Sequence, residues 1–218
     1  MTTIEAIAIP HQISSGLRVA SDVCGGAFDA RLFGVTGRSI FIRQSYTGPL
    51  LKIVGPGQAA IGGGTVVDAF FPRVNSRGDV IFGAVVAETG RPRRTDVYRY
   101  SGGKLTAVAR YGDLMPDGLQ FRHAWSRTWG INDDGDVVFF AITLGSLKGG
   151  FASQISTAIY ASSKGAMQYV AREGAVLLGA GLLASPDIPT VIIGPRGDVA
   201  FSMRTFDKYT FQYVRHLL

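Results

Sequence analysis

Apolar residues occur along the chain in short runs of three to seven, rich in Val, Ile, Phe and Tyr and bounded by Gly, Asp, Asn or Pro. Runs of this length and composition predict β-strands separated by turns. No stretch keeps the 3.6-residue spacing of an amphipathic helix. The clearest part of the sequence predicts four strands, at residues 97–100, 105–110, 129–132 and 136–143. We therefore expect an all-β protein.

The strand pattern recurs with a regular period. The motif Gly-Asp-Val-x-Phe appears three times, with its aspartates at Asp79, Asp136 and Asp198, which are 57 and 62 residues apart. The sequence between the motifs repeats as well, because residues 97–113 align with residues 159–175. A period of this size is typical of repeated supersecondary units.

The repeat predicts how a single domain, residues 1–218, is organised. The expected parts are a half-unit at 12–37, three units at 38–90, 91–145 and 158–204, and a C-terminal strand at 209–215. Four short antiparallel strands in a unit of about 60 residues predict a small β-propeller of about four blades. The half-unit and the C-terminal strand would then form one composite blade and close the ring. If they do not, we expect the open sheet edges to pair with another subunit.

One of the repeats resembles a known family. The segment Ile131-Asn-Asp-Asp-Gly-Asp-Val137, with Val-Tyr-Arg-Tyr, Val-Ala-Arg-Tyr-Gly-Asp and Pro116-Asp-Gly118 before it, resembles bacterial extracellular propeller-like proteins with I-N-x-x-G-x-V-x-F units. The resemblance covers most of residues 40–204 and implies a propeller architecture without a common reaction. The chain departs from the pattern at Gly194, where the Asn is absent, and in having no visible export signal.

Composition narrows the class of protein further. The 218 residues are 46% hydrophobic and 17% charged, which excludes a disordered chain, and the glycines follow no collagen period. No apolar run is long enough to cross a membrane as a helix, and the single cysteine, Cys24, excludes an internal disulfide. Residues 1–10 lack the features of a signal peptide, so the sequence as written predicts a cytoplasmic protein. A leader that had been removed would instead indicate an extracellular or periplasmic one.

The net charge of +6 permits an acidic partner without identifying one. The only dense basic group is Arg91, Arg93 and Arg94, in a Gly-Arg-Pro-Arg-Arg stretch that we expect to be a solvated loop. The alternative is a phosphate-binding patch. Because the other positive charges are scattered, we do not expect a nucleic-acid partner.

The candidate ligand-binding residues lie in residues 121–129 and in the loop before them. That segment holds both tryptophans, beside a histidine and two arginines, and aromatic rings next to arginines can stack on sugars or bases. No tryptophan stands at the matching place in the neighbouring repeats. The alternative is that the tryptophans pack in the core. The candidates are His123, Trp125, Arg127, Trp129, Asp113 and Asp117.

The turn at residues 132–136 carries Asp133, Asp134 and Asp136, and its closely spaced carboxylates resemble part of a calcium loop. In the matching turns of the other two repeats, Arg stands in place of the second Asp. The alternative is a hairpin turn with an Asp–backbone bond, and we predict no metal site. The three histidines also fall at no metal-ligand spacing.

A competing motif is Tyr160-Ala-Ser-Ser-Lys164, which resembles the Y-x-x-x-K signature of short-chain dehydrogenases. The resemblance implies that Lys164 would lower the pKa of Tyr160, so that the phenol could exchange a proton with a substrate carbonyl. The glycine-rich turn that binds a dinucleotide in that family is missing. The alternative is a strand of the repeat, in which Tyr160 aligns with Tyr98.

These patterns predict a non-catalytic binding or protein-interaction module on a β-propeller scaffold, with a protein or a glycan as partner and without a cofactor. A first alternative is a structural subunit that forms a homo-oligomer through exposed sheet edges. A second alternative is an oxidoreductase that uses Tyr160 and Lys164. The sequence identifies no ligand.

Overall fold

The structure, a computed structural model, consists of antiparallel β-sheets. It describes residues 18–19, 26–43, 48–146, 153–177, 181–182, 190–204 and 209–214. These residues form no helix, so the all-β prediction is confirmed. A helix capable of spanning a membrane is accordingly not found in this part of the chain. His11, Cys24 and His216 lie outside the described residues.

The first two sheets have four strands each, arranged in chain order. The first sheet contains β1 (Arg18–Val19), β2 (Gly26–Arg31), β3 (Arg38–Arg43) and β4 (Leu50–Val54). The second contains β5 (Thr65–Val74), β6 (Val80–Glu88), β7 (Arg91–Ser101) and β8 (Lys104–Ala109). Each strand pairs with the next along the chain, as in a meander.

The third sheet repeats this arrangement, and the fourth has three strands. The third contains β9 (Gln120–Ile131), β10 (Val137–Ser146), β11 (Ser153–Ser163) and β12 (Ala166–Arg172). The fourth contains β15 (Val191–Ile193), β16 (Val199–Arg204) and β17 (Tyr209–Val214). Between the third and fourth sheets in the sequence, β13 (Val176–Leu177) and β14 (Gly181–Leu182) form a two-stranded sheet.

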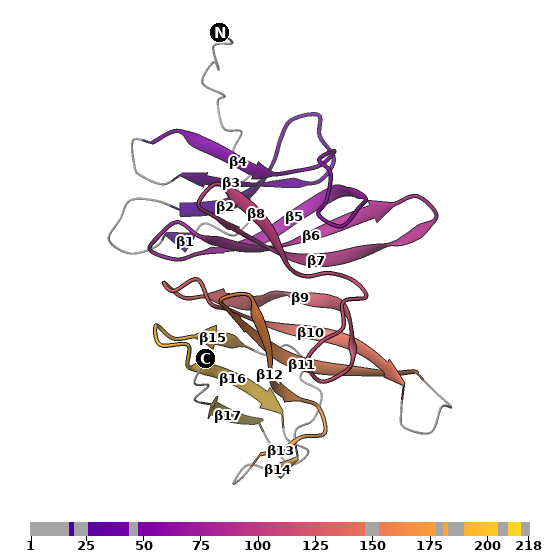
Figure 1. The fold of residues 1–218 in the computed structure, drawn as a ribbon. Coiled ribbons are helices and arrows are strands. Elements are labelled where there is room, and N and C mark those ends of the chain that lie inside the picture. The colour runs from indigo at the N-terminus through magenta and orange to yellow at the C-terminus, as the bar shows by residue number, and fades with distance from the viewer. Residues whose placement is uncertain are drawn as a thin grey trace.

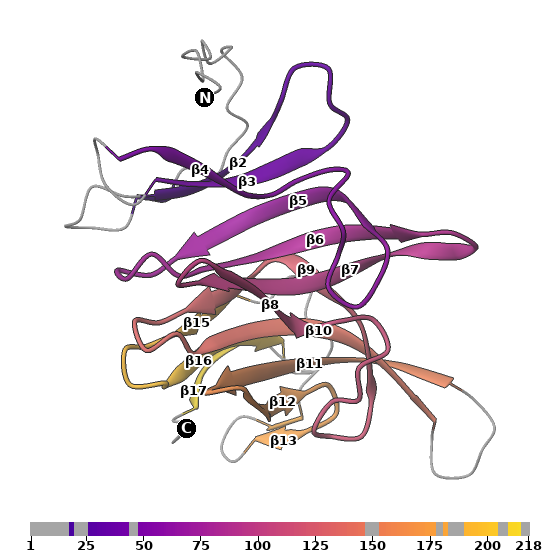
Figure 2. The same cartoon turned by 45° about the horizontal axis from the view of Figure 1, so that its top comes forward.

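The four larger sheets follow one another through the molecule (Figures 1 and 2), and neighbouring sheets meet at the first strand of the later one. β5 packs on β2 and β3, β9 packs on β5, β6 and β7, and β15 packs on β9 and β10. No comparable contact in the described residues joins the fourth sheet to the first. In the part of the chain that the structure describes, the sheets therefore do not form a closed ring.

Each junction between sheets has its own hydrophobic core. The central strand β6 contributes to two of them, because successive side chains point to opposite faces of a strand. Val80 and Phe82 belong to the core shared with the first sheet, whereas Ile81 belongs to the core shared with the third. Since both faces are covered, residues 80–84 are all buried and form a continuous apolar run.

The sheets are offset from the predicted sequence units by two strands. The four strands predicted at residues 97–143 are parts of β7, β8, β9 and β10, and so belong to two sheets. Each unit thus spans the end of one sheet and the beginning of the next. A repeat has the same period wherever it is divided, so the period does not show where a sheet begins.

The predicted composite blade is corrected by the strand pairing. β1 pairs with β2 and β2 pairs with β3, while β17 pairs with β16. The two terminal fragments therefore do not share a sheet. Pairing with a neighbour in sequence closes a short loop, which costs less conformational entropy than joining the two ends of a long chain.

The prediction that the arginine-rich stretch forms a solvated loop is also wrong, because Arg91, Arg93 and Arg94 lie in β7. Residues 91–96 pair with β6 only, since β8 pairs with residues 97–101 of the same strand. This part of β7 therefore has one open edge. Pro92, which has no amide hydrogen to donate, is tolerated at an edge of this kind.

Candidate functional site

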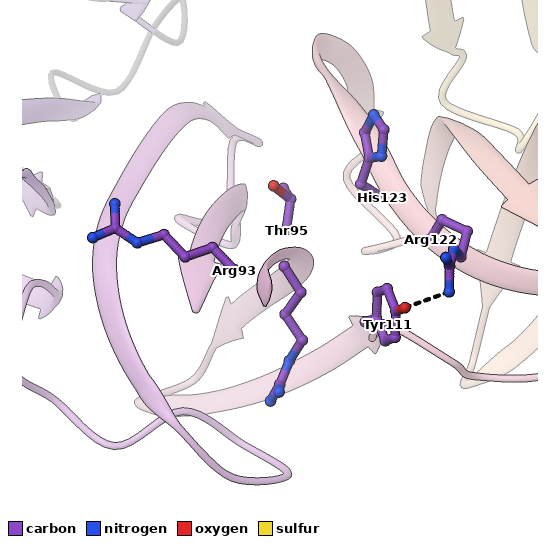
Figure 3. A pocket seen from close by; sticks show the side chains of 6 residues that line it. Arg93, Thr95, Tyr111, Arg122 and His123 are labelled. Carbon is purple, nitrogen blue, oxygen red and sulfur yellow. Dashed lines mark hydrogen bonds between the residues drawn. The ribbon is translucent and has the colours of Figure 1, made fainter. Parts of the chain in front are cut away.

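A pocket of about 270 Å³ lies between the second and third sheets, beside the uncovered part of β7. Its wall combines basic, aromatic and hydroxyl side chains from β7, β9 and the loop after β8. Tyr111 and Arg122 meet in this pocket with His123 and Thr95 nearby, while the side chain of Arg93 extends away from them (Figure 3). The lining residues are Arg93, Arg94, Thr95, Tyr111, Arg122 and His123.

A buried carboxylate on β7 holds Tyr111 in position. Asp96 is 0% exposed and accepts a hydrogen bond from the backbone N–H of Tyr111 at 2.9 Å. Its Oδ2 accepts from the Tyr98 hydroxyl and from Arg94 Nε, both at 3.2 Å. Burial, and then the charge of Asp96, raise the pKa of Tyr98, so this phenol remains a donor. Arg94, Asp96 and Tyr98 meet in this way because alternate residues of a strand share one face.

The pocket carries a surplus of positive charge. The positive charge of Arg94 is neutralised by two carboxylates, because its Nη1 lies 2.5 Å from Glu88 Oε2 and its Nε lies 3.2 Å from Asp96 Oδ2. Arg122 instead donates to the Tyr111 hydroxyl, and its guanidinium carbon lies 4.6 Å from the centroid of the Tyr111 ring. No carboxylate of the described residues lies within ion-pair distance of Arg122. The stacking fixes the guanidinium while leaving its charge without an acidic partner.

His123 connects the pocket to an aromatic surface. Its ring centroid lies 6.4 Å from that of Trp125, which in turn lies 6.4 Å from the ring of Phe140. Burial, and secondly the charge of Arg122, lower the pKa of His123, so its imidazole is neutral at neutral pH. Trp125 is 37% exposed. The predicted candidates His123 and Trp125 are thus neighbours at one surface.

A bulge in β9 places Trp125 at that surface. The pairing of β9 with β10 shifts between Ala124 and Trp129, which leaves residues 125–128 without partners in β10. A bulge re-aims the side chains that it carries, and the Thr128 hydroxyl donates to the Trp125 carbonyl at 2.7 Å within it. The side chain of Arg127, another candidate, lies outside the described residues.

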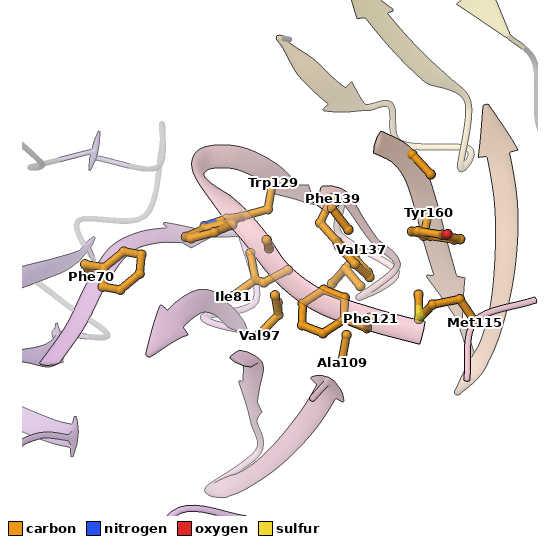
Figure 4. Packing of buried hydrophobic residues seen from close by; sticks show 13 residues of the cluster. Phe70, Ile81, Val97, Ala109, Met115, Phe121, Trp129, Val137, Phe139 and Tyr160 are labelled. Carbon is orange, nitrogen blue, oxygen red and sulfur yellow. The ribbon is translucent and has the colours of Figure 1, made fainter. Parts of the chain in front are cut away.

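Trp129 belongs to the core between the second and third sheets, beside Phe70 (Figure 4). It is 2% exposed, and its Nε1 donates to the Phe71 carbonyl at 2.7 Å. Gly83 on β6 makes room for the indole, because a Cβ there would come within 2.6 Å of Trp129 Cη2. For this tryptophan, the geometry agrees with the alternative of core packing.

The acidic candidates Asp113 and Asp117 accept hydrogen bonds from residues outside the pocket. Asp113 accepts from the backbone N–H of Arg110 at 2.8 Å and closes the turn after β8. Asp117 accepts from the Tyr160 hydroxyl at 3.0 Å, and its side chain is 7% exposed. Neither residue lines the pocket.

Two carboxylates of the 132–136 turn take part in hydrogen bonds. Asp133 Oδ1 accepts from the backbone N–H of Ser76 at 2.9 Å, and this bond lowers the pKa of Asp133. Asp136 Oδ2 accepts from Asn132 Nδ2 at 3.1 Å, while Asp134 is exposed. Within the described ranges, no group of three or more His, Cys, Asp or Glu could hold a metal ion. The hydrogen bond of Asp136 lies within a hairpin turn, and that of Asp133 joins this turn to the one at Ser76.

The oxidoreductase alternative finds no support in the geometry of Tyr160 and Lys164. Tyr160 is 0% exposed, and burial together with the charge of Asp117 raises its pKa, whereas proton transfer at neutral pH requires a lower one. Lys164 lies in the exposed turn after β11, with a φ of 49°. The described residues also lack the helix that follows a dinucleotide-binding turn.

Thr95, Tyr111 and Arg122 are pocket residues that the sequence did not single out as candidates. A signal was present, since the basic stretch at residues 91–94 precedes the aromatic and basic stretch at residues 121–129, although the first was expected to be a loop. Joining the two requires the knowledge that β7 and β9 lie side by side, which is a tertiary contact.

A model of a family of unknown function, DUF7453, matches residues 24–211. No curated protein matches the sequence. Among solved structures, an α-L-arabinofuranosidase from Fusarium graminearum, in a mutant form bound to an iminosugar inhibitor, has a TM-score of 0.37 and 10% identity over 93% of this chain. The complex of the GH93 α-L-arabinofuranosidase of the same fungus with arabinobiose has a TM-score of 0.36, also with 10% identity over 93% of this chain. This chain spans 59% and 60% of those two proteins, and similarity at this level does not extend to a site or an activity.

Proposed function

We propose that this chain, which belongs to the DUF7453 family of unknown function, is a non-catalytic binding module that meets its ligand at the pocket between β7 and β9. The observation that carries the proposal is the state of Arg122. Its guanidinium is stacked on Tyr111 and has no carboxylate partner in the described part of the chain. A fixed and uncompensated cation in a concave site is suited to holding a ligand.

The scaffold of this module, in our proposal, is of the propeller type, with each of the four larger sheets acting as one blade. Three features support this. The sheets are antiparallel meanders, and the first strand of each later sheet packs on the sheet before it. Asparagine side chains also join the hairpins of the second, third and fourth sheets. A rigid scaffold of this kind presents loops and strand ends as a binding surface.

Thermal unfolding of the full chain with a panel of neutral and acidic oligosaccharides tests the proposal. A ligand present at 100 times its Kd should add about 2.7 kcal/mol to the stability of the folded state. The shift should be lost in Arg122→Gln and reduced in Trp125→Ala. Arg91→Gln is the matched control, because Arg91 is exposed on the same strand as Arg94 but does not line the pocket. A ligand whose shift is the same in all variants binds elsewhere and would overturn the proposed location.

The fourth sheet favours a second candidate function, that of a structural subunit. In the described residues it has three strands where the other three large sheets have four, so β17 is an edge strand. An edge strand offers unpaired backbone groups to another chain. Sedimentation equilibrium together with unfolding at several protein concentrations would identify such assembly, because the midpoint of an oligomer rises with concentration. A monomer at all concentrations removes this candidate.

A further inference from the structure

We infer that the pocket recognises the carboxylate of an acidic sugar, a uronate unit in a glycan or at its end. This inference rests on the proposed function and adds the chemistry of the ligand. It is carried by a group of side chains that the structure brings together from β7, the loop after β8, and β9.

The carboxylate is assigned to Arg122. A guanidinium presents parallel N–H donors that match the two oxygens of a carboxylate, and such charged pairs are about twice as strong as neutral hydrogen bonds. The Tyr111 ring beneath Arg122 orients its plane, and Asp96 holds the Tyr111 backbone. The charge of Arg94 is already met by Glu88 and Asp96, and the side chain of Arg93 extends away from Tyr111 and Arg122 (Figure 3). Arg122 is therefore the cation beside Tyr111 that an incoming acid would neutralise.

The hydroxyl groups of a sugar suit the remaining wall of the pocket. Thr95 supplies a hydroxyl, and a neutral His123 supplies one donor and one acceptor nitrogen. Neither group adds positive charge, the charge of Arg94 is already paired with Glu88 and Asp96, and Arg93 extends away from Arg122 (Figure 3). With one unpaired guanidinium beside Tyr111, the pocket is better suited to a planar carboxylate on a hydroxylated ring than to a densely charged phosphate. Phosphate sites in proteins instead gather several charged or backbone donors.

The size of the pocket and its aromatic neighbour point to a single sugar ring. A volume of about 270 Å³ lies just below the roughly 300–1,000 Å³ of pockets for drug-sized ligands. Trp125, partly exposed next to His123, supplies a flat apolar face for the adjoining unit of a glycan. The net charge of +6 would also attract an acidic polymer.

Calorimetric titration of the full chain with four probes tests the inference. The probes are D-glucuronate, D-glucose, acetate and inorganic phosphate. D-Glucuronate is expected to bind at least about tenfold more tightly than each of the others, which is the range for a charged hydrogen-bonded contact. Arg122→Gln should remove this preference, Arg122→Lys should keep part of it, and Arg91→Gln should leave it unchanged. Circular dichroism and unfolding midpoints confirm that each variant is folded.

Each other result overturns the inference. Equal binding of glucuronate and glucose would mean that the carboxylate is not recognised, although a sugar-binding module remains. Tighter binding of phosphate or acetate would indicate a general anion site. Binding of none of the four probes would reject the acidic sugar, while an oligosaccharide from the panel that requires Arg122 would still support the proposed function.

Discussion

The side-chain amide of Asn75 donates a hydrogen bond to the backbone carbonyl of Asn132 at 2.8 Å, although 57 residues separate them. Both occupy the same position of the repeat, and Asn132 makes the equivalent bond to the carbonyl of Gly194 at 3.2 Å, 62 residues further on. Each asparagine also fixes its own turn, since its Oδ1 accepts the backbone N–H four residues later at 2.8 Å. The repeat period is therefore visible in the structure as bonds between equivalent residues of successive sheets.

We expect Asn75→Ala and Asn132→Ala each to lower the free energy of unfolding by about 1–3 kcal/mol, because buried groups lose their hydrogen-bond partners. Urea denaturation measures this. Asp134→Ala is the control, since Asp134 is exposed in the same turn as Asn132, and it should change stability by less than about 0.5 kcal/mol. An Asn75 variant as stable as the wild type would contradict the structural role.

Gly194→Asn should stabilise the protein by about 1 kcal/mol, because an asparagine there can bond the Asp198 backbone as the other two copies do. A Cβ at Gly194 meets its nearest neighbour, the Asp198 carbonyl oxygen, at 3.5 Å, which is ordinary contact. Gly194→Ala separates the backbone effect from that of the amide. Thermal unfolding that shows the two variants to be equal would rule out the amide contribution.

Gly83→Ala should destabilise the protein by about 1–3 kcal/mol through overpacking, because its Cβ would collide with the indole of Trp129 and the ring of Phe70. Trp129→Phe removes the collision with the indole but keeps the one with Phe70, so Gly83→Ala should lose part of its cost in that background. A double-mutant cycle by chemical denaturation measures this coupling. Gly83→Ala in the Trp125→Ala background, where the indole of Trp129 is intact, should keep its full cost.

The protein should lose stability as the pH falls below about 6.5, the ordinary pKa of histidine, because the folded-state pKa of His123 is lower. Between the two values the unfolded chain binds the proton more readily than the folded one, so stability rises with pH there and is fully present above pH 6.5. His123→Gln should flatten the dependence of the unfolding free energy on pH in this window. If His123→Gln showed the same dependence of the unfolding free energy on pH as the wild type, His123 would not be the group responsible. The other charged or titratable groups of the pocket are Arg93, Arg94, Tyr111 and Arg122.

Tyr160→Phe should destabilise the protein by about 1–3 kcal/mol, because it leaves the buried carboxylate of Asp117 without the hydroxyl that donates to it. Adding Asp117→Asn should recover part of the loss, since the amide carries no charge. Lys164→Ala, in the exposed turn after β11, should leave the unfolding midpoint nearly unchanged. A large loss with Lys164→Ala would show that Tyr160 and Lys164 act together after all.

The sequence alone determined the features that depend on neighbouring residues. Short β-branched and aromatic runs indicated the strands, and glycines indicated the tight turns, as at Gly102 and Gly103, where φ is 56° and 83°. The repeat period was also visible, since equivalent positions keep the same residue types. These signals are local because they reflect the pleat of a strand and the backbone conformation of a turn.

Only the tertiary structure decided where each sheet begins, which tryptophan is buried and where the pocket lies. Trp129 and Trp125 are four residues apart in similar sequence, yet a bulge and the space above Gly83 place one in the core and the other at the surface. The pocket needs β7 beside β9, so that Arg122 meets Tyr111. Contacts of this kind depend on how sheets pack on one another, and the packing depends on shape complementarity over many residues distant in sequence.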